Sequence, residues 1–599
     1  MGDRFGRLLL VDLSKQAYEV LEVGGEVIRA FLGGKGLGAY LLYKLLKPRA
    51  NPLGPENVLM LLTGPLTGTG YPTAGRVVVV TKSPLTGLFL DSYAGGWFGP
   101  DLRRLGYDGL IITGRAEEPT YLWLSEEGPE LRDASHIWGQ LTGWAVELVR
   151  AETDRRAHVA AIGPAGENLV RFAAIVFDRD EDPWRSGVAG RGGAGAVMGS
   201  KLLKAIAIRA GRGRVPVRDQ GAFRELLGRL YEKMKGSPFY YIRRAVGTSY
   251  WLEPMNRLGF LPTRNFTSGF VEDHYRLTGS YLRAHVRKDT ACPYCPMGCG
   301  KVVEVPEGVV KVEYEILAMM GANDGIRDAL EVARSAKLAT ELGLDGISAG
   351  VVVGFAMEAG QRGLLEDVPG FGDAEGQREL LRSIAYREGV GDLLAEGVRC
   401  AAEVLGPEAE ELAVHVKGLE LPGYDPRASW GMALAYATAD RGGCHQRAWT
   451  VRAEIDGRLR RFSTEGLAEF VKAVQDERAA AFSLIVCDFA PLGVKDFIAG
   501  LKAAVGLEYG MEEYLRVGER IWNLTRLLNI REAGISRADD TLPPRVFEEP
   551  LPMPDGREAR IGRETLASLL DEYYALRGWD EQGRPTPEKL EELGLDELL

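Results

Sequence analysis

The sequence predicts an α+β protein in which a β-rich N-terminal domain precedes two mainly helical domains. Up to about residue 210, short apolar runs are bounded by Gly, Pro or Asp, which is typical of strands joined by turns. After a Gly- and Arg-rich linker at 209–218, apolar residues recur at helical spacing. A weaker break lies near residue 418, where Gly and Pro interrupt the helical pattern. We therefore expect domains at residues 1–211, 212–417 and 418–599.

Within the first domain, residues 7–23 alternate around a short polar turn, which predicts a hairpin. Further strands are expected at 57–64, 75–82, 108–114 and 120–126, together with a single helix over about 26–46. In the later part, the spacing predicts helices at 223–235, 330–343, 354–365 and 378–389. The last residues, 585–599, read as an acidic amphipathic tail.

The composition excludes several classes of protein. The chain has 73 Lys and Arg against 84 Asp and Glu, a net charge of −11, and no long basic run, so nucleic acid is not the expected partner. The longest apolar stretch, 347–357, is shorter than the ~18 residues of a membrane span, and the N-terminus lacks a targeting pattern. A cytoplasmic protein that does not bind membranes is expected. Glycine is abundant, 76 of 599 residues, and occurs in clusters.

Three of the six cysteines lie within eight residues, as a C-x2-C-x3-C run of Cys292, Cys295 and Cys299. This spacing favours an iron–sulfur cluster with a distant fourth ligand. Zinc with a fourth ligand elsewhere is the alternative, and three unligated thiols are a third. The fourth ligand must come from another cysteine or a histidine. The helical sequence around Cys400 favours a core position for that thiol.

Four glycine-rich segments could line a phosphate-bearing cofactor. The fourth leads into a helix start, where free backbone N–H groups attract phosphate. For any one segment, an ordinary turn between strands is the alternative, but four within 200 residues favour a ligand. The segments are Gly33–Gly38, the run ending at Arg76, the pair Gly95 and Gly96, and Gly190–Gly199.

Two polar islands carry candidate catalytic groups. Glu313 and Glu315 lie on a segment in which polar and apolar residues alternate. The simpler interpretation of such a segment is a strand with one face in solvent. The second island runs from Asp440 to His445. His445 is one of only six histidines and is a candidate for proton transfer near neutral pH. A satisfied structural histidine is the alternative there.

Taken together, these blocks resemble the tungsten-containing aldehyde:ferredoxin oxidoreductase family over nearly the whole length. The matching blocks are SPLTG at 83–87, AGGWFGPDLRRLGYDGLIITG at 94–114, IGPAGEN at 162–168, GRGGAGAVMGSKLLKAI at 190–206, LPTRNF at 261–266, CPYCPMGCGK at 292–301, EYE at 313–315, LGLDGIS at 342–348, LPGYDPR at 421–427 and RGGCH at 441–445.

The resemblance implies a first domain that serves as the base for a tungsten bis(pyranopterin dithiolene), with Mg²⁺ bridging the pterin phosphates. It implies a [4Fe–4S] cluster on Cys292, Cys295, Cys299 and Cys487. Glu315 and His445 would stand beside the metal as catalytic groups. The implied cofactor-binding residues are Arg76, between the cofactor and the cluster, and Gly95, Gly96, Ala189, Gly190, Arg191, Gly192, Gly193, Gly343 and Asp345.

The implied reaction is oxidation of an aldehyde to the carboxylic acid, with electrons passing through the cluster to ferredoxin or another electron-transfer subunit. Molybdenum in place of tungsten stays open, because dithiolenes bind either. An acidic ferredoxin needs a local basic patch, for which 242–244 and 458–462 are candidates and ordinary solvated arginines the alternative. Three further readings remain: a divergent tungsten subunit of a multi-subunit enzyme reducing acids or aryl-CoA, an electron-transfer subunit without pterin, and a zinc protein.

Several positions depart from the family pattern. Thr340, Phe482 and Ile485 replace the usual Asp, Asp and Gly of the two pterin motifs, which removes two carboxylates. Where some relatives carry an E-x-x-H iron site at a dimer interface, this chain has Arg334 and Lys337. We therefore expect any oligomer or hetero-complex to form without interfacial iron.

Overall fold

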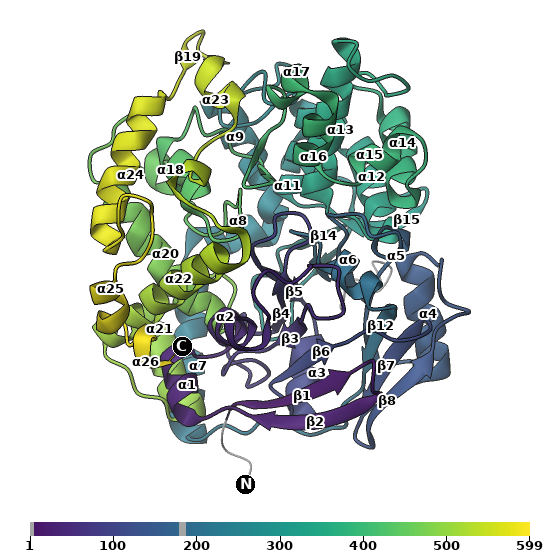
Figure 1. Cartoon of the computed structure of the whole chain (residues 1–599), viewed down its shortest axis with the longest axis vertical. Coiled ribbons are helices and arrows are strands. Elements are labelled where there is room, and N and C mark those ends of the chain that lie inside the picture. Colours follow the sequence, from purple (N-terminus) through teal and green to yellow (C-terminus); the bar gives the residue numbers. More distant parts are fainter. Residues whose placement is uncertain (1–4, 179–186, 599) are drawn as a thin grey trace.

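A computed structural model describes residues 5–178 and 187–598. The first 210 residues form two stacked six-stranded mixed sheets, and helices cover them on two sides (Figure 1). This confirms the α+β class and the β-rich beginning of the chain. In the described ranges, no helix is long and apolar enough to span a bilayer.

The two sheets each contain one parallel pair and otherwise antiparallel neighbours. The first has the order β2-β1-β6-β3-β4-β5 and the second β11-β10-β9-β12-β7-β8. Strands of the first sheet are β1 Arg7–Asp12, β2 Ala17–Glu22, β3 Leu59–Leu62, β4 Arg76–Lys82, β5 Phe89–Gly95 and β6 Gly109–Thr113. Those of the second are β7 Thr120–Ser125, β8 Gly128–Asp133, β9 His158–Ala161, β10 Ile175–Phe177, β11 Gly187–Ala189 and β12 Leu203–Ile208.

Alternation along the strands produces three apolar layers. On β4, Val77 and Val79 join a core shared with β7 and β12 of the second sheet, whereas Val78 and Val80 face the large core of the helical part. A third core lies between the second sheet and α4. Because both faces of the first sheet are buried, β4 reads as a continuous apolar run. The helices of this part are α1 Gly25–Phe31, α2 Gly34–Leu45, α3 Phe98–Arg104, α4 Thr142–Glu152, α5 Pro164–Glu167 and α6 Ala194–Ser200.

The single helix expected at 26–46 is wrong. The chain forms α1 and α2, separated at Leu32, whose φ of +62° lies in the left-handed region. The helical spacing is kept on both sides of this break, which is why the pattern looked continuous. The break lets α2 turn onto β4 and against α20 and α22 of the C-terminal part.

The remainder of the chain is mainly helical, with one three-stranded sheet and two short hairpins. The expected helices at 223–235, 330–343, 354–365 and 378–389 overlap α7, α12, α13 and α14. The longer helices are α7 Gln220–Lys235, α8 Pro238–Val246, α9 Leu252–Leu258, α12 Ala329–Leu342, α13 Gly346–Gln361, α14 Ala374–Tyr386, α16 Val398–Leu405, α18 Trp430–Thr438, α20 Leu467–Ser483, α21 Val494–Val505, α22 Met511–Ala533 and α24 Arg563–Arg577. The three-stranded sheet is β13 Val286–Thr290, β14 Gly300–Val305 and β15 Gly308–Lys311.

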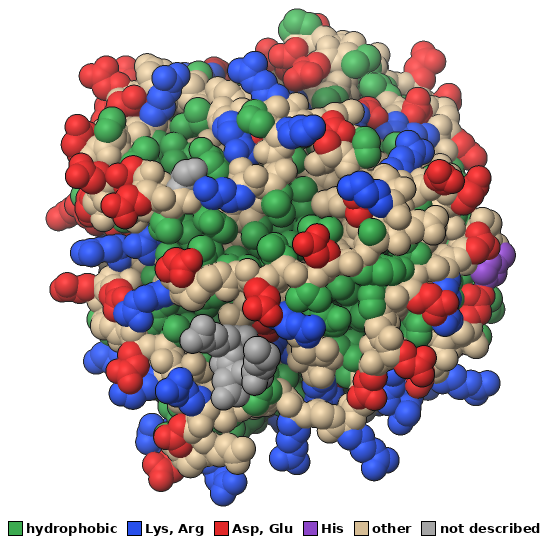
Figure 2. All heavy atoms as spheres, turned by 60° about the horizontal axis from the view of Figure 1, so that its bottom comes forward, with side chains coloured by type: hydrophobic (Ala, Val, Ile, Leu, Met, Phe, Trp, Pro, Cys, Tyr) green, Lys and Arg blue, Asp and Glu red, His purple; other side chains and the backbone are tan. Residues whose placement is uncertain are grey.

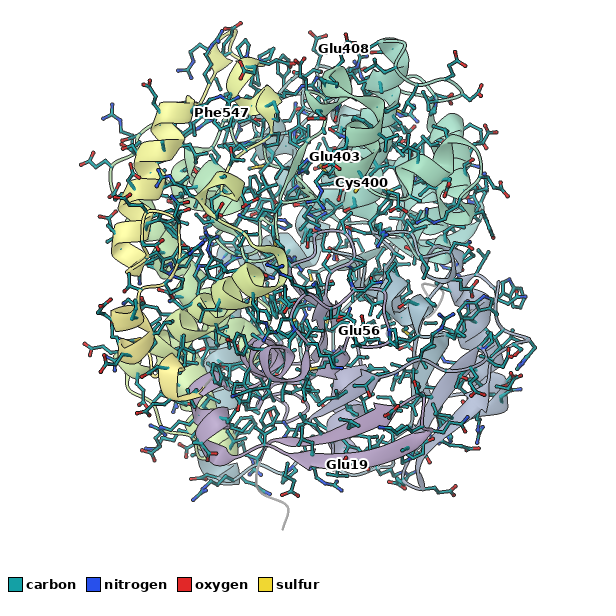
Figure 3. The ribbon with its side chains drawn as sticks, in the orientation of Figure 1. Glu19, Glu56, Cys400, Glu403, Glu408 and Phe547 are labelled. Atoms are coloured by element: carbon teal, nitrogen blue, oxygen red, sulfur yellow. The ribbon has the colours of Figure 1, made fainter. Side chains whose placement is uncertain are left out.

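Charged side chains of both signs cover the exterior. Figure 2 shows the face brought forward from the bottom of Figure 1: hydrophobic side chains gather at its centre, and Lys and Arg project along its lower rim. The acidic tail folds into α25 Pro587–Glu592 and α26 Leu595–Leu598. Cys400 lies on α16 beside Glu403, as Figure 3 shows; its place in a helix is confirmed, but it is only half-buried, so the expected core position is wrong.

Candidate active site

Three of the candidate cluster cysteines lie on the loop between β13 and β14, and Cys487 follows α20. Burial raises the pKa of the Cys295 thiol, and the neighbouring thiols of Cys292, Cys299 and Cys487 raise it further. Cys292 and Cys487 likewise raise the pKa of Cys299. Two segments almost 190 residues apart in the chain therefore bring their thiols within electrostatic range of one another.

A single zinc ion is the alternative that the sequence leaves open at these thiols. Among the described residues, no three His, Cys, Asp or Glu side chains form a group that could hold one metal ion. Zinc needs four ligands at about 2.0–2.3 Å from one point. A four-iron cluster instead takes one thiolate on each of four separate irons, so its sulfurs are spread more widely.

Arg76 and Gly95 pair across β4 and β5 next to this loop. A Cβ on Gly95 would lie 2.5 Å from the Cys292 sulfur, so only glycine leaves room for the thiol there. Burial lowers the pKa of Arg76, but the charges of Cys487 and Cys292 raise it by more. The Arg76 Nε is buried and has no hydrogen-bond partner among the described residues. An unpaired buried guanidinium N–H is costly, so this atom points to a ligand.

The loop at 189–193 lies against the start of α13. Asp345 caps α13 by accepting from the Ile347 and Ser348 N–H groups. A Cβ on Gly190 would lie 3.2 Å from the Asp345 Oδ1. Arg191 donates to Asp345 Oδ2 at 3.3 Å and to the Gly443 carbonyl at 2.8 Å. Arg191 therefore connects the glycine loop to the family-matching block at 342–348 and to the polar segment before His445.

Backbone conformation or a close neighbour requires glycine at several of the expected cofactor-binding positions. Gly193 has a φ of +88°, and a Cβ there would lie 2.0 Å from the Arg171 carbonyl oxygen. Gly343 ends α12 in the left-handed conformation, and Gly192 and Gly96 also have positive φ. The expected start of a helix after the loop is confirmed by α6, which follows Gly193. Ala189 ends β11, opposite Ile175.

The three residues that depart from the family motifs each make a specific contact or adopt a specific conformation in the interior. The Thr340 hydroxyl donates to the Ala336 carbonyl at 2.9 Å, so it turns back onto its own helix. Phe482 packs against Tyr93 with ring centroids 5.2 Å apart. Ile485 has a φ of +57°, a conformation that costs a β-branched residue about 1–2 kcal/mol. Its side chain fills the space beside Gly34.

The two candidate catalytic residues face one another. His445 Nε2 lies 3.4 Å from Glu315 Oε1, and their side chains are only 12% and 16% exposed. The other oxygen of Glu315 accepts the Gly423 N–H at 2.9 Å, whereas Oε1 is buried without a hydrogen-bond partner among the described residues. The expected strand at Glu313 and Glu315 is wrong: Glu313 precedes a helical turn, α11 Tyr314–Ile316. The turn aims Glu315 inward while Glu313 stays exposed.

Burial sets the protonation of this pair. It raises the pKa of Glu315 to about 7, although the Gly423 N–H acts to lower it. Burial also lowers the pKa of His445 far below its usual range, and Arg191 and Arg441 lower it further. At neutral pH the imidazole is therefore uncharged. As the amide is placed, Gln446 donates to His445 Nε2 at 2.8 Å, which puts the ring proton on Nδ1.

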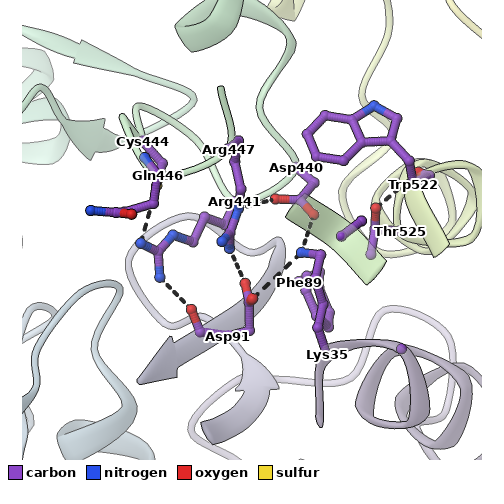
Figure 4. A network of polar contacts seen from close by, with 12 residues as sticks. Lys35, Phe89, Asp91, Asp440, Arg441, Cys444, Gln446, Arg447, Trp522 and Thr525 are labelled. Atoms are coloured by element: carbon purple, nitrogen blue, oxygen red, sulfur yellow. Dashed lines mark hydrogen bonds and ion pairs between the residues drawn. The ribbon is translucent and has the colours of Figure 1, made fainter. Parts of the chain in front are cut away.

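A buried ionic network supports the segment that carries His445 (Figure 4). Lys35 forms an ion pair with Asp440 and contacts Asp91 at 3.5 Å, and all three side chains are essentially buried. Arg447 pairs with both Asp440 and Asp91. The arginine and the lysine lower the pKa of Asp440 although burial raises it. Lys35, in the first glycine-rich segment, thus binds carboxylates of the protein.

Sequence reasoning missed the aromatic side chains beside the pair. Tyr424 lies 5.6 Å from the His445 ring, stacks on Tyr314 and meets Trp449 edge-on. No periodic pattern signals these contacts, because they join separate loops. Arg447 could have been found, since it stands two residues after His445 in the same polar island.

Both halves of the chain match known families. The N-terminal domain of aldehyde ferredoxin oxidoreductase matches residues 8–210, and its domains 2 and 3 match residues 225–595. A tungsten-containing aldehyde ferredoxin oxidoreductase from Thermococcus kodakarensis is 41% identical over 100% of both chains. The one from Pyrococcus furiosus is 40% identical over 100% of both.

Two more distant proteins are also similar. The WOR-like subunit of an aliphatic sulfonate oxidoreductase from Pyrococcus furiosus is 33% identical over 99% of this chain and 97% of its own. A chain of the active-site complex BamBC of benzoyl coenzyme A reductase, solved with 1,5-dienoyl-CoA, has a TM-score of 0.84 at 26% identity over 99% and 97%. The fold and the matched sequence define a class of redox enzymes. The chain belongs to the aldehyde ferredoxin oxidoreductase family.

Proposed function

We propose that this protein oxidises an aldehyde to its carboxylic acid and passes the two electrons, one at a time, to ferredoxin. The single observation that carries the proposal is the buried pair of Glu315 and His445. The overall change is R–CHO + H₂O → R–COO⁻ + 3 H⁺ + 2 e⁻. The names of the relatives at 40–41% identity support the substrate class and the acceptor.

The residues fit the cofactors that this activity needs. The partnerless Nε of Arg76 fits a ligand beside the cysteine loop, and Gly95 leaves room for the Cys292 thiol that would hold the cluster. We assign the pterin contacts to the predicted residues at 95–96, 189–193, 343 and 345, and the [4Fe–4S] ligands to Cys292, Cys295, Cys299 and Cys487. Mg²⁺ between the pterin phosphates belongs to the same proposal. When bound, the tungsten bis(pyranopterin dithiolene) supplies the two-electron redox chemistry.

The chain itself positions the aldehyde and handles protons. The neutral His445 can donate its Nδ1–H to the carbonyl oxygen, which stabilises the charge that develops there. Glu315 Oε1 is free to accept a proton from the attacking water, because no described group occupies it. A base with a pKa of about 7 is suited to both accepting and releasing that proton near neutral pH.

Elemental analysis and one variant test the proposal. Anaerobically purified protein should contain tungsten or molybdenum together with iron, and should reduce benzyl viologen when an aldehyde is added. Glu315→Gln should keep the metal content and lower kcat/KM by ~100-fold or more. If metal-replete protein shows no aldehyde-dependent dye reduction, the proposed function is wrong. If the variant keeps normal turnover, Glu315 is not the base.

A second candidate is a divergent subunit of a multi-subunit enzyme that reduces acids or aryl-CoA at low potential. The similarity to a BamBC chain favours it, as does the apolar pair of Phe482 and Tyr93 where a carboxylate is usual. Purification from the native source decides between the two. Stable co-purifying iron–sulfur or flavin subunits, with little free aldehyde oxidation, are the result expected for the second candidate.

A further inference from the structure

A surface cavity of about 440 Å³ opens next to the cysteine loop. Its lining includes Gly68 and Thr69, Val215 to Val217, residues of α7, and Tyr294. Tyr294 stands directly before Cys295 in the chain, so their Cα atoms are about 3.8 Å apart. The cavity therefore reaches from the surface to the loop that carries three of the candidate cluster ligands.

Tyr294 is held rigidly in this wall. Its hydroxyl accepts from Arg104 at 3.1 Å, and its ring meets Trp97 edge-on at 5.5 Å. The Tyr231 hydroxyl donates to its backbone carbonyl at 3.5 Å. A partner that binds in the cavity would thus contact a fixed surface above the cysteines.

The lining is positively charged. Of the twelve lining residues, three are arginines and none is acidic, in a chain of net charge −11. Arg104 already pairs with the buried Asp101. Arg214 and Arg224 are exposed, and neither pairs with a carboxylate of the described residues. The same lining includes apolar Val215, Val217 and Phe223, so the cavity combines positive charge with apolar surface.

Three arginines of the two basic segments that the sequence offered for docking make contacts within the fold. Arg243 is buried over the Phe489 ring at 4.3 Å, and Arg244 donates to the Pro296 carbonyl at 3.1 Å. Arg461 donates to the Leu258 carbonyl at 3.2 Å. Arg243 and Arg244 thus make their contacts beside the cysteine loop and Arg461 at the end of α9, so we base the docking proposal on the cavity described here.

We propose that Arg214, Arg224 and the apolar floor between them form the docking surface for an acidic iron–sulfur protein of the ferredoxin type. This inference rests on the proposed function. Opposite charge raises the rate of encounter and fixes the orientation, and the apolar floor supplies contact area. Two encounters per aldehyde would each remove one electron through the cysteine loop.

A charge reversal tests the surface. In Arg214→Glu/Arg224→Glu, the KM for an acidic [4Fe–4S] ferredoxin should rise ~10-fold or more, and the decrease of kcat/KM between ~0.01 and 0.15 M salt should flatten. The Kd for the same ferredoxin, measured calorimetrically, should rise in parallel. Aldehyde-dependent reduction of benzyl viologen should not fall. The matched control is Arg257→Glu, in a second cavity lined by residues of both charges, including Glu253 and Glu272.

The outcomes separate the two proposals. Loss of viologen reduction in wild-type protein removes the proposed function itself. Normal viologen activity with an unchanged ferredoxin KM, Kd and salt dependence in the double variant overturns the docking surface alone. A change in the oligomeric state of the double variant would assign the cavity to a second copy of this chain and would also overturn the proposal.

Discussion

Glu315 Oε1 lies 3.4 Å from His445 Nε2, although 130 residues separate them in the chain. Burial moves the two pKa values in opposite senses: it favours the uncharged form of each group. Two neighbouring titratable groups with displaced pKa values are typical of acid–base sites. Here the glutamate, and not the histidine, titrates near neutral pH.

This assignment predicts the pH dependence of the reaction. A base acts when deprotonated, so kcat/KM should rise as pH increases through about 7 and level off above it. His445, with its lowered pKa, should add no inflection near 7. The profile should be measured with an aldehyde and benzyl viologen, and Glu315→Gln should lose the inflection. A wild-type rate that falls with rising pH over this range would contradict the role of Glu315 as a base.

Cys487 should be required for the iron centre. Cys487→Ser should lose most of the about four irons per chain, because a hydroxyl is a poor ligand for iron in such clusters. Cys400→Ser is the matched control, since Cys400 lies on α16 and is expected to keep full iron content. Iron analysis and the visible absorption of the cluster are the measurements. Equal iron in both variants would remove Cys487 from the ligand set.

Lys35→Met should destabilise the fold strongly. The substitution leaves Asp440 and Asp91 buried with Arg447 as their main cation, and breaking a buried pair costs about 3–5 kcal/mol. Lys15→Met is the control, because the Lys15 side chain is 78% exposed and its pair with Asp12 is screened by solvent. Urea midpoints of the two variants give the comparison. Equal midpoints would show that the buried network contributes little.

Gly193→Ala should be poorly tolerated. Its left-handed φ costs an alanine about 1–2 kcal/mol, and the added Cβ would also collide with the Arg171 carbonyl oxygen. Gly228→Ala, on the exposed face of α7 where nothing lies within 4 Å of a Cβ, should instead stabilise by about 0.5–1 kcal/mol. Thermal inactivation at a fixed temperature should therefore be faster than wild type for the first variant and slower for the second. The same sign for both would contradict this.

Local patterns predicted most of the regular elements. The hairpin of β1 and β2 and the strands β3, β4, β6 and β7 formed where periodicity placed them, and the four expected helices overlap α7, α12, α13 and α14, although α13 begins eight residues earlier than expected. The break at Leu32 was missed because apolar spacing continues through it, while the tertiary contacts of α2 decide the turn. The inward aim of Glu315 was missed for a similar reason, since the alternating residues around it give no sign of the helical turn.

The site was predictable where residues occur in a motif, and not where distant segments meet. Arg191, Asp345 and the island before His445 were each found by motif, and the structure joins them through hydrogen bonds. The pair of Lys35 and Asp440 spans 405 positions, and no local pattern signals such a contact. The same holds for the basic cavity, whose walls come from four separate stretches of the chain.

The packing of α2 against α20 and α22 has a consequence for synthesis. The part of this early helix that packs against α20 and α22 stays uncovered until the ribosome has produced the chain up to about Ala533. At ~5–20 residues per second, that takes about 25–100 s after the helix emerges. Throughout this interval the nascent polypeptide exposes an aggregation-prone apolar surface. Production in a foreign host should therefore depend on chaperone capacity and benefit from slow growth at low temperature.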